Sequence, residues 1–297
     1  MIIGDNRLAV IQNIKKNANE RDFTAKAEIG DPEMTAQEQL QLVQDFWQDR
    51  GKLSSKLNGL LGRGIINAIT KTVLASTKVE GIDKLKGMPK GGAIITANHF
   101  NQIDALAVNR VANQAHKKME IVIEDTNLKL PGFFGYIMNN MGSIPLVQSP
   151  NYLGRDFVHH LSHAFNRNHW VLIFPEQEMW WNYRKPRKTQ RGAYYFAAKC
   201  NVPVIATFIE IQELPKLEKK DPNFYQTRYV VHVLGVIYPD PTKSVNVNAT
   251  EMMEKDYALK VACYEKVYKK KLDYDFTDWD IAGWRGEAAG KPAEQTE

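Results

Sequence analysis

Cysteine is scarce in this sequence, because only Cys200 and Cys263 occur among 297 residues. Two cysteines supply neither a disulfide framework nor a four-thiolate zinc site, and they fit a reducing compartment. No apolar run approaches the roughly 20 residues that a membrane-spanning helix requires. Residues 1–7 also lack the basic and then apolar layout of a signal peptide. These absences predict a soluble or peripheral intracellular protein.

Two common catalytic motifs are missing as well. The sequence contains no Gly-x-Ser-x-Gly turn, which carries the nucleophile of many serine hydrolases, and no Gly-x4-Gly-Lys-Ser/Thr loop for nucleotide phosphates. Hydrolase and nucleotidase functions therefore lack support. The composition, with 43% hydrophobic and 25% charged residues, is that of a globular chain and excludes a disordered one.

Positive charge is concentrated in two windows that contain no acidic residue. The net charge is +5, yet residues 51–79 carry five bases and residues 179–209 carry six. Windows of this kind typically meet an anionic partner, such as phosphate, nucleic acid or an acidic lipid surface. The simpler alternative is a solvated basic face.

The first 78 residues show helical periodicity. Residues 36–50 predict an amphipathic helix, and a second helical pattern runs over residues 52–78. In the second pattern the bases fall within an arc of about 100°, and most of the apolar residues lie opposite. Such a helix can lie in the interface of an anionic membrane, or it can pack on the protein's own core with a wet basic side. We therefore define residues 1–78 as a helical N-terminal region that could contact a membrane surface.

From about residue 79, short β-branched runs alternate with helical stretches. The expected strands are residues 92–97, 120–123, 143–147, 170–174, 202–209 and 228–237. The expected helices lie near residues 103–115, 152–167, 189–200 and 250–271. This alternation predicts an α/β fold with a largely parallel central sheet flanked by helices. We expect this domain to span residues 79–275, followed by a flexible C-terminal tail at residues 276–297.

One histidine lies where α/β folds build active sites. The predicted strand 92–97 runs directly into His99, and Asp104 follows at the start of the next predicted helix. A carboxylate bonded to one ring nitrogen fixes the tautomer and stabilises the imidazolium, so the other nitrogen can take a proton from a hydroxyl group. The spacing alone is weak evidence, because Asp104 could simply cap its helix.

Three further blocks follow this pair along the chain. They are Gly142-Ser143-Ile144-Pro145, Phe174-Pro175-Glu176 and Val202-Pro203-Val204-Ile205. Together with Asn98-His99-x4-Asp104, these blocks resemble the four motifs of the glycerolipid acyltransferase family, typified by 1-acylglycerol-3-phosphate acyltransferases. The resemblance covers residues 79–210, and its specific part is the first and third blocks at their usual separation.

The resemblance implies transfer of a fatty acyl group from acyl-CoA or acyl carrier protein to a hydroxyl of a lyso-phospholipid, 1-acylglycerol-3-phosphate in the first instance. His99 would be the general base and Asp104 would orient it, without a covalent acyl-enzyme, a cofactor or a metal. The residues also support this chemistry, because a thioester is already activated and a positioned base with proximity suffices. The expected substrate-binding residues are Asn98, Gly142, Ile144, Pro145, Phe174, Pro175, Glu176, Arg184, Lys185, Arg187 and Arg191.

The sequence departs from the family pattern at two positions associated with the acceptor's phosphate. Gln148 stands where the second block usually ends in arginine, and Gln177-Glu178-Met179 replaces the Gly-Thr-Arg that usually ends the third. The cations of residues 184–191 could replace the missing arginines, since a guanidinium binds phosphate bidentately. The departures also permit another acceptor, such as a glycolipid or a lipid-linked precursor.

Aromatic residues at positions 180, 181 and 183 stand next to these cations. Such rings beside bases are also found in single-stranded nucleic-acid platforms, but no recognition-module signature accompanies them, so no nucleic acid is expected. In an interfacial enzyme they would lie at the headgroup level, and core packing is the third option. The histidines at 159, 160 and 163 lack an obvious third ligand, which favours a solvated face over a zinc site.

The preferred interpretation is a peripheral enzyme on the inner, cytoplasmic face of the cell membrane. Helix 52–78 and the Trp/Arg segment would dock on anionic lipid, where acceptor and product reside. The alternative from another class is a catalytically silent lipid-binding protein, against which His99, Asp104 and Glu176 count. The sequence leaves open the acyl chain length, the carrier, the acceptor headgroup and the oligomeric state.

Overall fold

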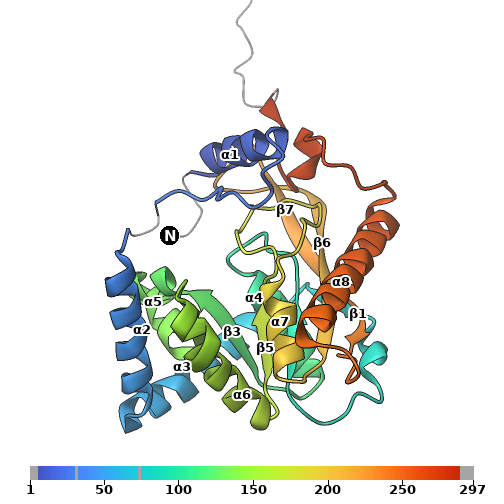
Figure 1. Cartoon of the computed structure of the whole chain (residues 1–297). Coiled ribbons are helices and arrows are strands. Elements are labelled where there is room, and N and C mark those ends of the chain that lie inside the picture. The colour runs from blue at the N-terminus through green and yellow to red at the C-terminus, as the bar shows by residue number, and fades with distance from the viewer. Residues whose placement is uncertain (1–5, 31–32, 73–74, 288–297) are drawn as a thin grey trace, which may run out of the picture.

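The computed structural model describes residues 6–30, 33–72 and 75–287. Within them, seven strands form one sheet in the order β1-β7-β6-β2-β5-β3-β4 (Figure 1). Neighbouring strands are parallel except β6 and β7, which pair antiparallel. The predicted α/β fold with a largely parallel sheet is therefore confirmed. The strands are β1 Lys78–Glu80, β2 Ala93–Thr96, β3 Met119–Glu124, β4 Ser143–Leu146, β5 Trp170–Ile173, β6 Val204–Leu217 and β7 Tyr225–Ile237.

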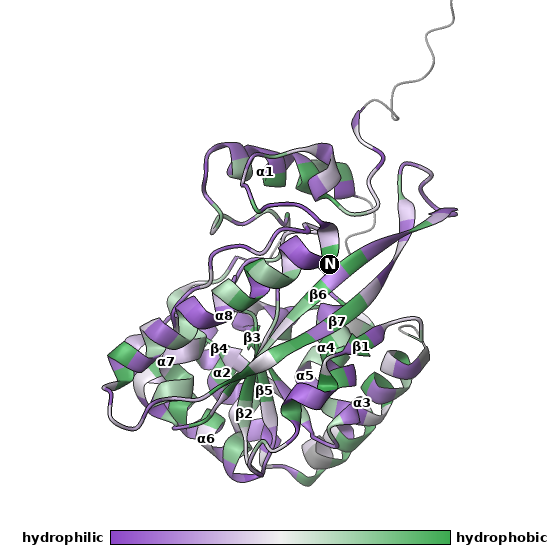
Figure 2. Ribbon diagram, turned by 90° about the vertical axis from the view of Figure 1, so that its right-hand side faces the viewer, coloured by the Kyte–Doolittle hydropathy of each residue, from purple (hydrophilic) through white to green (hydrophobic). Residues whose placement is uncertain are grey.

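Helices cover both faces of the sheet, as Figure 2 shows. On one side lie α6 (Val158–Asn166), α7 (Gly192–Lys199) and α8 (Val245–Tyr268). On the other lie α3 (Leu53–Thr72), α4 (Asp104–Gln114) and α5 (Gly132–Asn140), of which α5 was not predicted. All four residues of β2 are buried, as expected for an apolar strand of a parallel sheet between two helical layers.

The N-terminal region contributes two more helices. α2 (Ala36–Arg50) has the predicted bounds and begins with a capping box in which Thr35 and Glu38 bond each other. α1 (Arg7–Asn19) was not predicted from the sequence. None of the helices in the described ranges is both long and apolar enough to cross a membrane.

The predicted helix 52–78 is shorter in the structure, where it is α3, and Lys78 instead begins β1. Its bases do not form one wet face, because the Arg63 side chain lies inward with Nη2 4.0 Å from Oε1 of Glu120. Ile66 is buried in the core. Four leucines of the first half of α3 are 59–74% exposed, namely Leu53, Leu57, Leu60 and Leu61. The first half of α3 therefore presents a group of apolar side chains to solvent.

A second apolar cluster joins distant parts of the chain. Ile11 of α1 packs there with Trp180 and Trp181 from the segment after β5, and with Ile281 and Trp284 near the C-terminus. The flexible tail predicted at residues 276–297 therefore needs correction over 276–287, because Ile281 is fully buried in this cluster. Residues 288–297 lie outside the described residues.

Candidate active site

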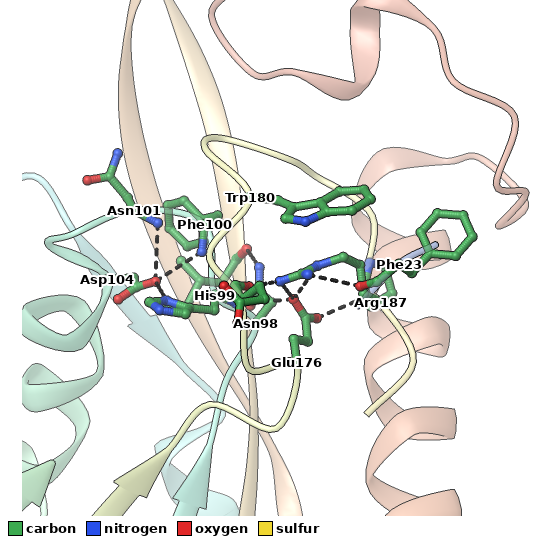
Figure 3. Close-up of polar contacts among 12 residues, drawn as sticks. Phe23, Asn98, His99, Phe100, Asn101, Asp104, Glu176, Trp180 and Arg187 are labelled. Carbon is green, nitrogen blue, oxygen red and sulfur yellow. Dashed lines mark hydrogen bonds and ion pairs between the residues drawn. The ribbon is translucent and has the colours of Figure 1, made fainter. Parts of the chain in front are cut away.

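A histidine and an aspartate meet at the carboxyl edge of the sheet. His99 follows β2, and Asp104 is the first residue of α4. Nδ1 of His99 lies 2.7 Å from Oδ2 of Asp104, and the same oxygen accepts the backbone N–H groups of Phe100 and Asn101 (Figure 3). The ring of His99 also stacks on Phe174, with centroids 4.1 Å apart. Because Asp104 is 1% exposed and bonded by two amides, it holds the imidazole in one orientation.

A buried ion pair between Glu176 and Arg187 lies next to this pair (Figure 3). Oε2 of Glu176 accepts the backbone N–H of His99 at 3.3 Å and Nε of Arg187 at 3.2 Å. The other guanidinium donors reach the carbonyl oxygens of Phe23 and Glu178. Burial lowers the pKa of Arg187, and the charge of Glu176 opposes this effect. The ion pair therefore connects the His99 loop to the segment after β5.

A cavity of about 490 Å³ lies beside His99, which lines it together with Phe174. One group of its lining residues is apolar and includes Ile121, Leu130, Met138, Met141, Phe157 and Phe196. A second group carries carboxylates or amides and includes Glu28, Gln39, Glu124, Asp125, Gln148, Glu178 and Gln190. The cavity thus combines a volume suited to a hydrocarbon chain with a polar wall near a histidine base.

The first and third blocks reach this cavity only in part. His99, Asp104, Phe174 and Pro175 line it, as predicted for a site at the ends of β2 and β5. Asn98 does not line it, because its side-chain amide exchanges two hydrogen bonds with the backbone of Ile209 and so ties β2 to β6. Glu176 is not among the lining residues either, since its carboxylate is bonded to Arg187 and to the His99 amide. Both residues therefore support the site from outside the cavity.

None of the four residues of the second block, 142–145, lines the cavity. Ile144 is fully buried in the core, and the carbonyl of Pro145 accepts the hydroxyl of Tyr152 at 2.7 Å. Gly142 has φ +99°, a left-handed conformation that favours glycine at the turn into β4. Lining residues from this stretch include Leu146 and Gln148 instead.

The basic segment that was expected to bind phosphate is directed into the protein. Arg184 is 4% exposed and bonds Glu213 at 2.6 Å. Lys185 is 3% exposed, and its Nζ lies 3.0 Å from Asp273 and 2.9 Å from Asp280. Together with Arg187, these cations neutralise buried or nearby carboxylates, so they do not supply the missing cations at the cavity. Arg191 is exposed, but it bonds Asn246 in the first turn of α8 and is not a lining residue.

The aromatic residues of the same segment are core residues. Trp180 is fully buried, Trp181 is 5% exposed and Tyr183 is 2% exposed. They offer neither a stacking platform for nucleic acid nor a surface for lipid, which corrects the expectation that this segment docks on a membrane. The physical reason is the second apolar cluster, which covers their rings.

The three histidines of α6 give no indication of a zinc site. His160 stacks on Trp47 with centroids 3.5 Å apart, and burial lowers its pKa to about 4. Among the described residues there is no group of three or more His, Cys, Asp or Glu that could hold a metal ion. The zinc alternative therefore gains no support.

Some lining residues were missed by the sequence analysis. Glu124 and Asp125 directly follow the predicted strand 120–123 at the same sheet edge as His99, so the rule that located His99 could have found them. Leu130 and Met138 had no such signal, because Leu130 follows η2 (Asp125–Lys129) and Met138 lies in α5, where no element was predicted.

The α/β sheet thus carries a His–Asp pair at its carboxyl edge, beside a partly apolar cavity, and such an arrangement is able to support general base chemistry. A family model described as Acyltransferase matches residues 76–210. These residues are therefore similar to an acyltransferase domain, and the predicted enzyme class, acyl transfer, is confirmed at this level.

Among solved structures, the chain is similar to the 1-acyl-sn-glycerophosphate (LPA) acyltransferase PlsC from Thermotoga maritima. The TM-score is 0.52 at 15% sequence identity, and the match covers 80% of this chain and 100% of that chain. At this identity the likeness supports the fold alone. No curated protein sequence matches the chain.

Proposed function

We propose that this protein transfers a fatty acyl group from a thioester to a hydroxyl group of a lyso-lipid, with His99 as the general base. The observation that carries the proposal is the 2.7 Å contact between His99 Nδ1 and Asp104 at a cavity that both residues line. In the proposed tautomer Nδ1 carries the ring proton and donates a hydrogen bond to Asp104, which leaves Nε2 without a proton and able to take one from the acceptor hydroxyl.

The chemistry proceeds without a covalent enzyme intermediate. As Nε2 removes the hydroxyl proton, the oxygen attacks the thioester carbonyl and a C–O bond forms. The tetrahedral intermediate then expels the thiolate, which takes the proton back from the imidazolium to give the free thiol and the ester. The carboxylate of Asp104 stabilises the imidazolium between these two steps.

The apolar lining gives the acyl chain a place next to the base. Leu130 follows η2, Met138 belongs to α5 and Phe196 to α7, so segments from both faces of the sheet line this part of the cavity. Burying a hydrocarbon chain there contributes about 0.8 kcal/mol per methylene group. The carrier of the acyl group is either coenzyme A or acyl carrier protein.

The acceptor class follows from the family resemblance, which gives a lyso-phospholipid, 1-acylglycerol-3-phosphate in the first instance, with a glycolipid or lipid-linked precursor as the alternative. Acceptor and product are both membrane lipids, so we place the enzyme on the inner, cytoplasmic membrane surface. The exposed leucines of α3 support this placement, because an apolar helix face beside basic residues suits an anionic lipid interface.

The test measures thiol release and acylated product from a long-chain acyl thioester, offered on both carriers with a panel of lyso-lipids. His99→Ala is expected to lower acceptor-dependent turnover by about 10²–10⁴-fold, the usual contribution of a general base. His163→Ala, an exposed histidine of α6, is the matched control and should retain full turnover. Full activity in His99→Ala would contradict the role of His99 as the general base. No product from wild type would contradict acyl transfer and favour a lipid-binding protein without turnover.

A further inference from the structure

The polar wall of the cavity consists of carboxylates and side-chain amides. Its carboxylates belong to Glu28, Glu124, Asp125 and Glu178, besides Asp104, and no lysine or arginine is among the lining residues of the described chain. Lys26 lies 3.9 Å from Glu124 without being one of the lining residues. Residues 1–5 and 31–32, which the structure does not describe, contain two aspartates and no lysine or arginine in their sequence. The described lining residues therefore supply no positive charge for a phosphate ligand.

Asp125 indicates what this wall does bind. It is 2% exposed, and Oδ1 accepts the backbone N–H of Thr126 at 3.0 Å. Oδ2 is buried without a hydrogen-bond partner, although the residue lines the cavity. A buried carboxylate oxygen without a hydrogen-bond partner destabilises the folded protein, because its interaction with water is lost and not replaced. The missing partner is a hydrogen-bond donor, and a ligand in the cavity can supply it.

The sheet register places Asp125 level with the base. Ile95 of β2, Leu172 of β5 and Ile121 of β3 are paired across the sheet. His99 and Asp125 each follow their strand residue by four positions, at the same carboxyl edge. The two strands are separated by β5, so their backbones are about 10 Å apart. An acceptor that presents one hydroxyl to His99 can therefore present another polar group to Asp125.

We propose that the head group of the acceptor is an uncharged polyol, a glycosyl or glyceryl group, and that Asp125 accepts a hydrogen bond from one of its hydroxyls. This inference rests on the proposed function and selects the alternative acceptor over a phosphomonoester. A hydroxyl donates to a carboxylate in a strong charge-assisted bond. A phosphomonoester carries about −1.5 to −2 charges and would be repelled by the same wall. Gln148 and residues 177–179 stand where the family motifs usually have arginines. Their presence also removes positive charge that would favour a phosphate group.

The experiment compares two acceptors of equal acyl chain length, a monoacylated glucosylglycerol and 1-acylglycerol-3-phosphate. Both are assayed with wild type, Asp125→Asn and Asp125→Leu, and their binding is followed separately by thermal shift in one neutral detergent. Wild type should have the higher kcat/KM, and the larger rise in Tm, with the glucosyl acceptor. Asp125→Leu should raise the KM for this acceptor about tenfold or more, since a charged hydrogen bond is lost, while the KM for the thioester stays unchanged.

The Tm of the variants without ligand distinguishes a binding role of Asp125 from a structural one. Asp125→Leu removes a buried unpaired carboxylate, so its Tm without ligand should equal or exceed that of wild type. Asp83→Asn, at an exposed position of η1 (Ile82–Leu85), is the control and should change neither KM. The inference is overturned if wild type prefers the phosphate acceptor, or if Asp125→Leu leaves the glucosyl KM unchanged. If no acceptor is acylated, the proposed function fails, and the thermal shifts still decide which head group the cavity favours.

Discussion

At the scale of single residues, the candidate site depends on two carboxylates with different tasks. Asp104 bonds the ring of His99 directly, whereas Glu176 bonds the backbone of His99 and is neutralised by Arg187. The first contact spans five residues of sequence and the second spans 77. The ring of His99 is therefore oriented by its own loop, and its backbone is positioned by a distant segment.

Removing the partner of Glu176 is expected to be costly. Arg187→Met leaves a carboxylate that is 2% exposed without its counter-ion, which should lower the free energy of unfolding by about 3–5 kcal/mol. The double variant Arg187→Met/Glu176→Gln should recover part of this loss, because no unpaired charge remains. Urea denaturation measures both effects, and turnover by the same samples shows whether the His99 loop has shifted. A double variant as unstable as the single one would mean that the ion pair is not the cause.

At the scale of elements, α3 divides into two halves with different surroundings. Its second half packs through Ile66 on the core, and its first half presents Leu53, Leu57, Leu60 and Leu61 to solvent. Exposed leucines this close together on one helix suit burial in a lipid interface, where each side chain contributes about 1.5–3 kcal/mol.

We expect Leu57→Ser/Leu60→Ser to weaken binding to liposomes by at least about tenfold. Leu217→Ser, at a leucine of β6 that is 37% exposed, is the control and should bind as wild type does. Wild type should also bind vesicles with anionic lipid more strongly than neutral ones. This preference should decrease at high salt, because salt screens the attraction between the basic residues and the anionic lipid. Sedimentation with vesicles of the two compositions measures all three effects. Unchanged sedimentation of the double variant would exclude α3 as the contact, and equal binding to both compositions would exclude its electrostatic part.

At the scale of the whole molecule, the second apolar cluster connects both ends of the described chain to the candidate site. Trp180, which belongs to this cluster, donates its backbone N–H to the carbonyl of His99 at 3.2 Å. Asn182 donates its backbone N–H to the carbonyl of Phe100 at 2.8 Å. The His99 loop is therefore supported by a core to which α1 and residues 276–287 contribute.

Trp284→Ala, in this cluster, should lower both stability and turnover. The tryptophan is 7% exposed, and replacing a buried tryptophan by alanine typically costs about 3–5 kcal/mol. Calorimetry would show the loss of stability, and turnover should fall at temperatures where the protein remains folded. Tyr238→Ala, at a 50% exposed aromatic residue, should change neither quantity. A destabilised Trp284→Ala protein with full turnover would show that the cluster does not position His99.

Most of the central sheet could be predicted from the sequence, because its strands are short apolar runs between helical patterns. The strands expected at 170–174 and 143–147 are β5 and β4 with bounds that differ by one residue. β1 and α5 were missed, since three residues and a glycine-containing segment carry little periodic signal. The tail from 276 was misjudged because its apolar residues are few and widely spaced, and only the cluster with α1 shows what buries them.

The sequence by itself determined the α/β fold and the meeting of His99 with Asp104, because strand, turn and helix start lie within a dozen residues of one another. Only the tertiary structure decided which charged side chains are paired and which lack a partner. Lys185 is neutralised by Asp273 and Asp280, 88 and 95 residues away, whereas Oδ2 of Asp125 is left without a partner at the cavity. The physical reason is that a buried charge is defined by the groups packed around it, and these come from segments that only the fold brings together.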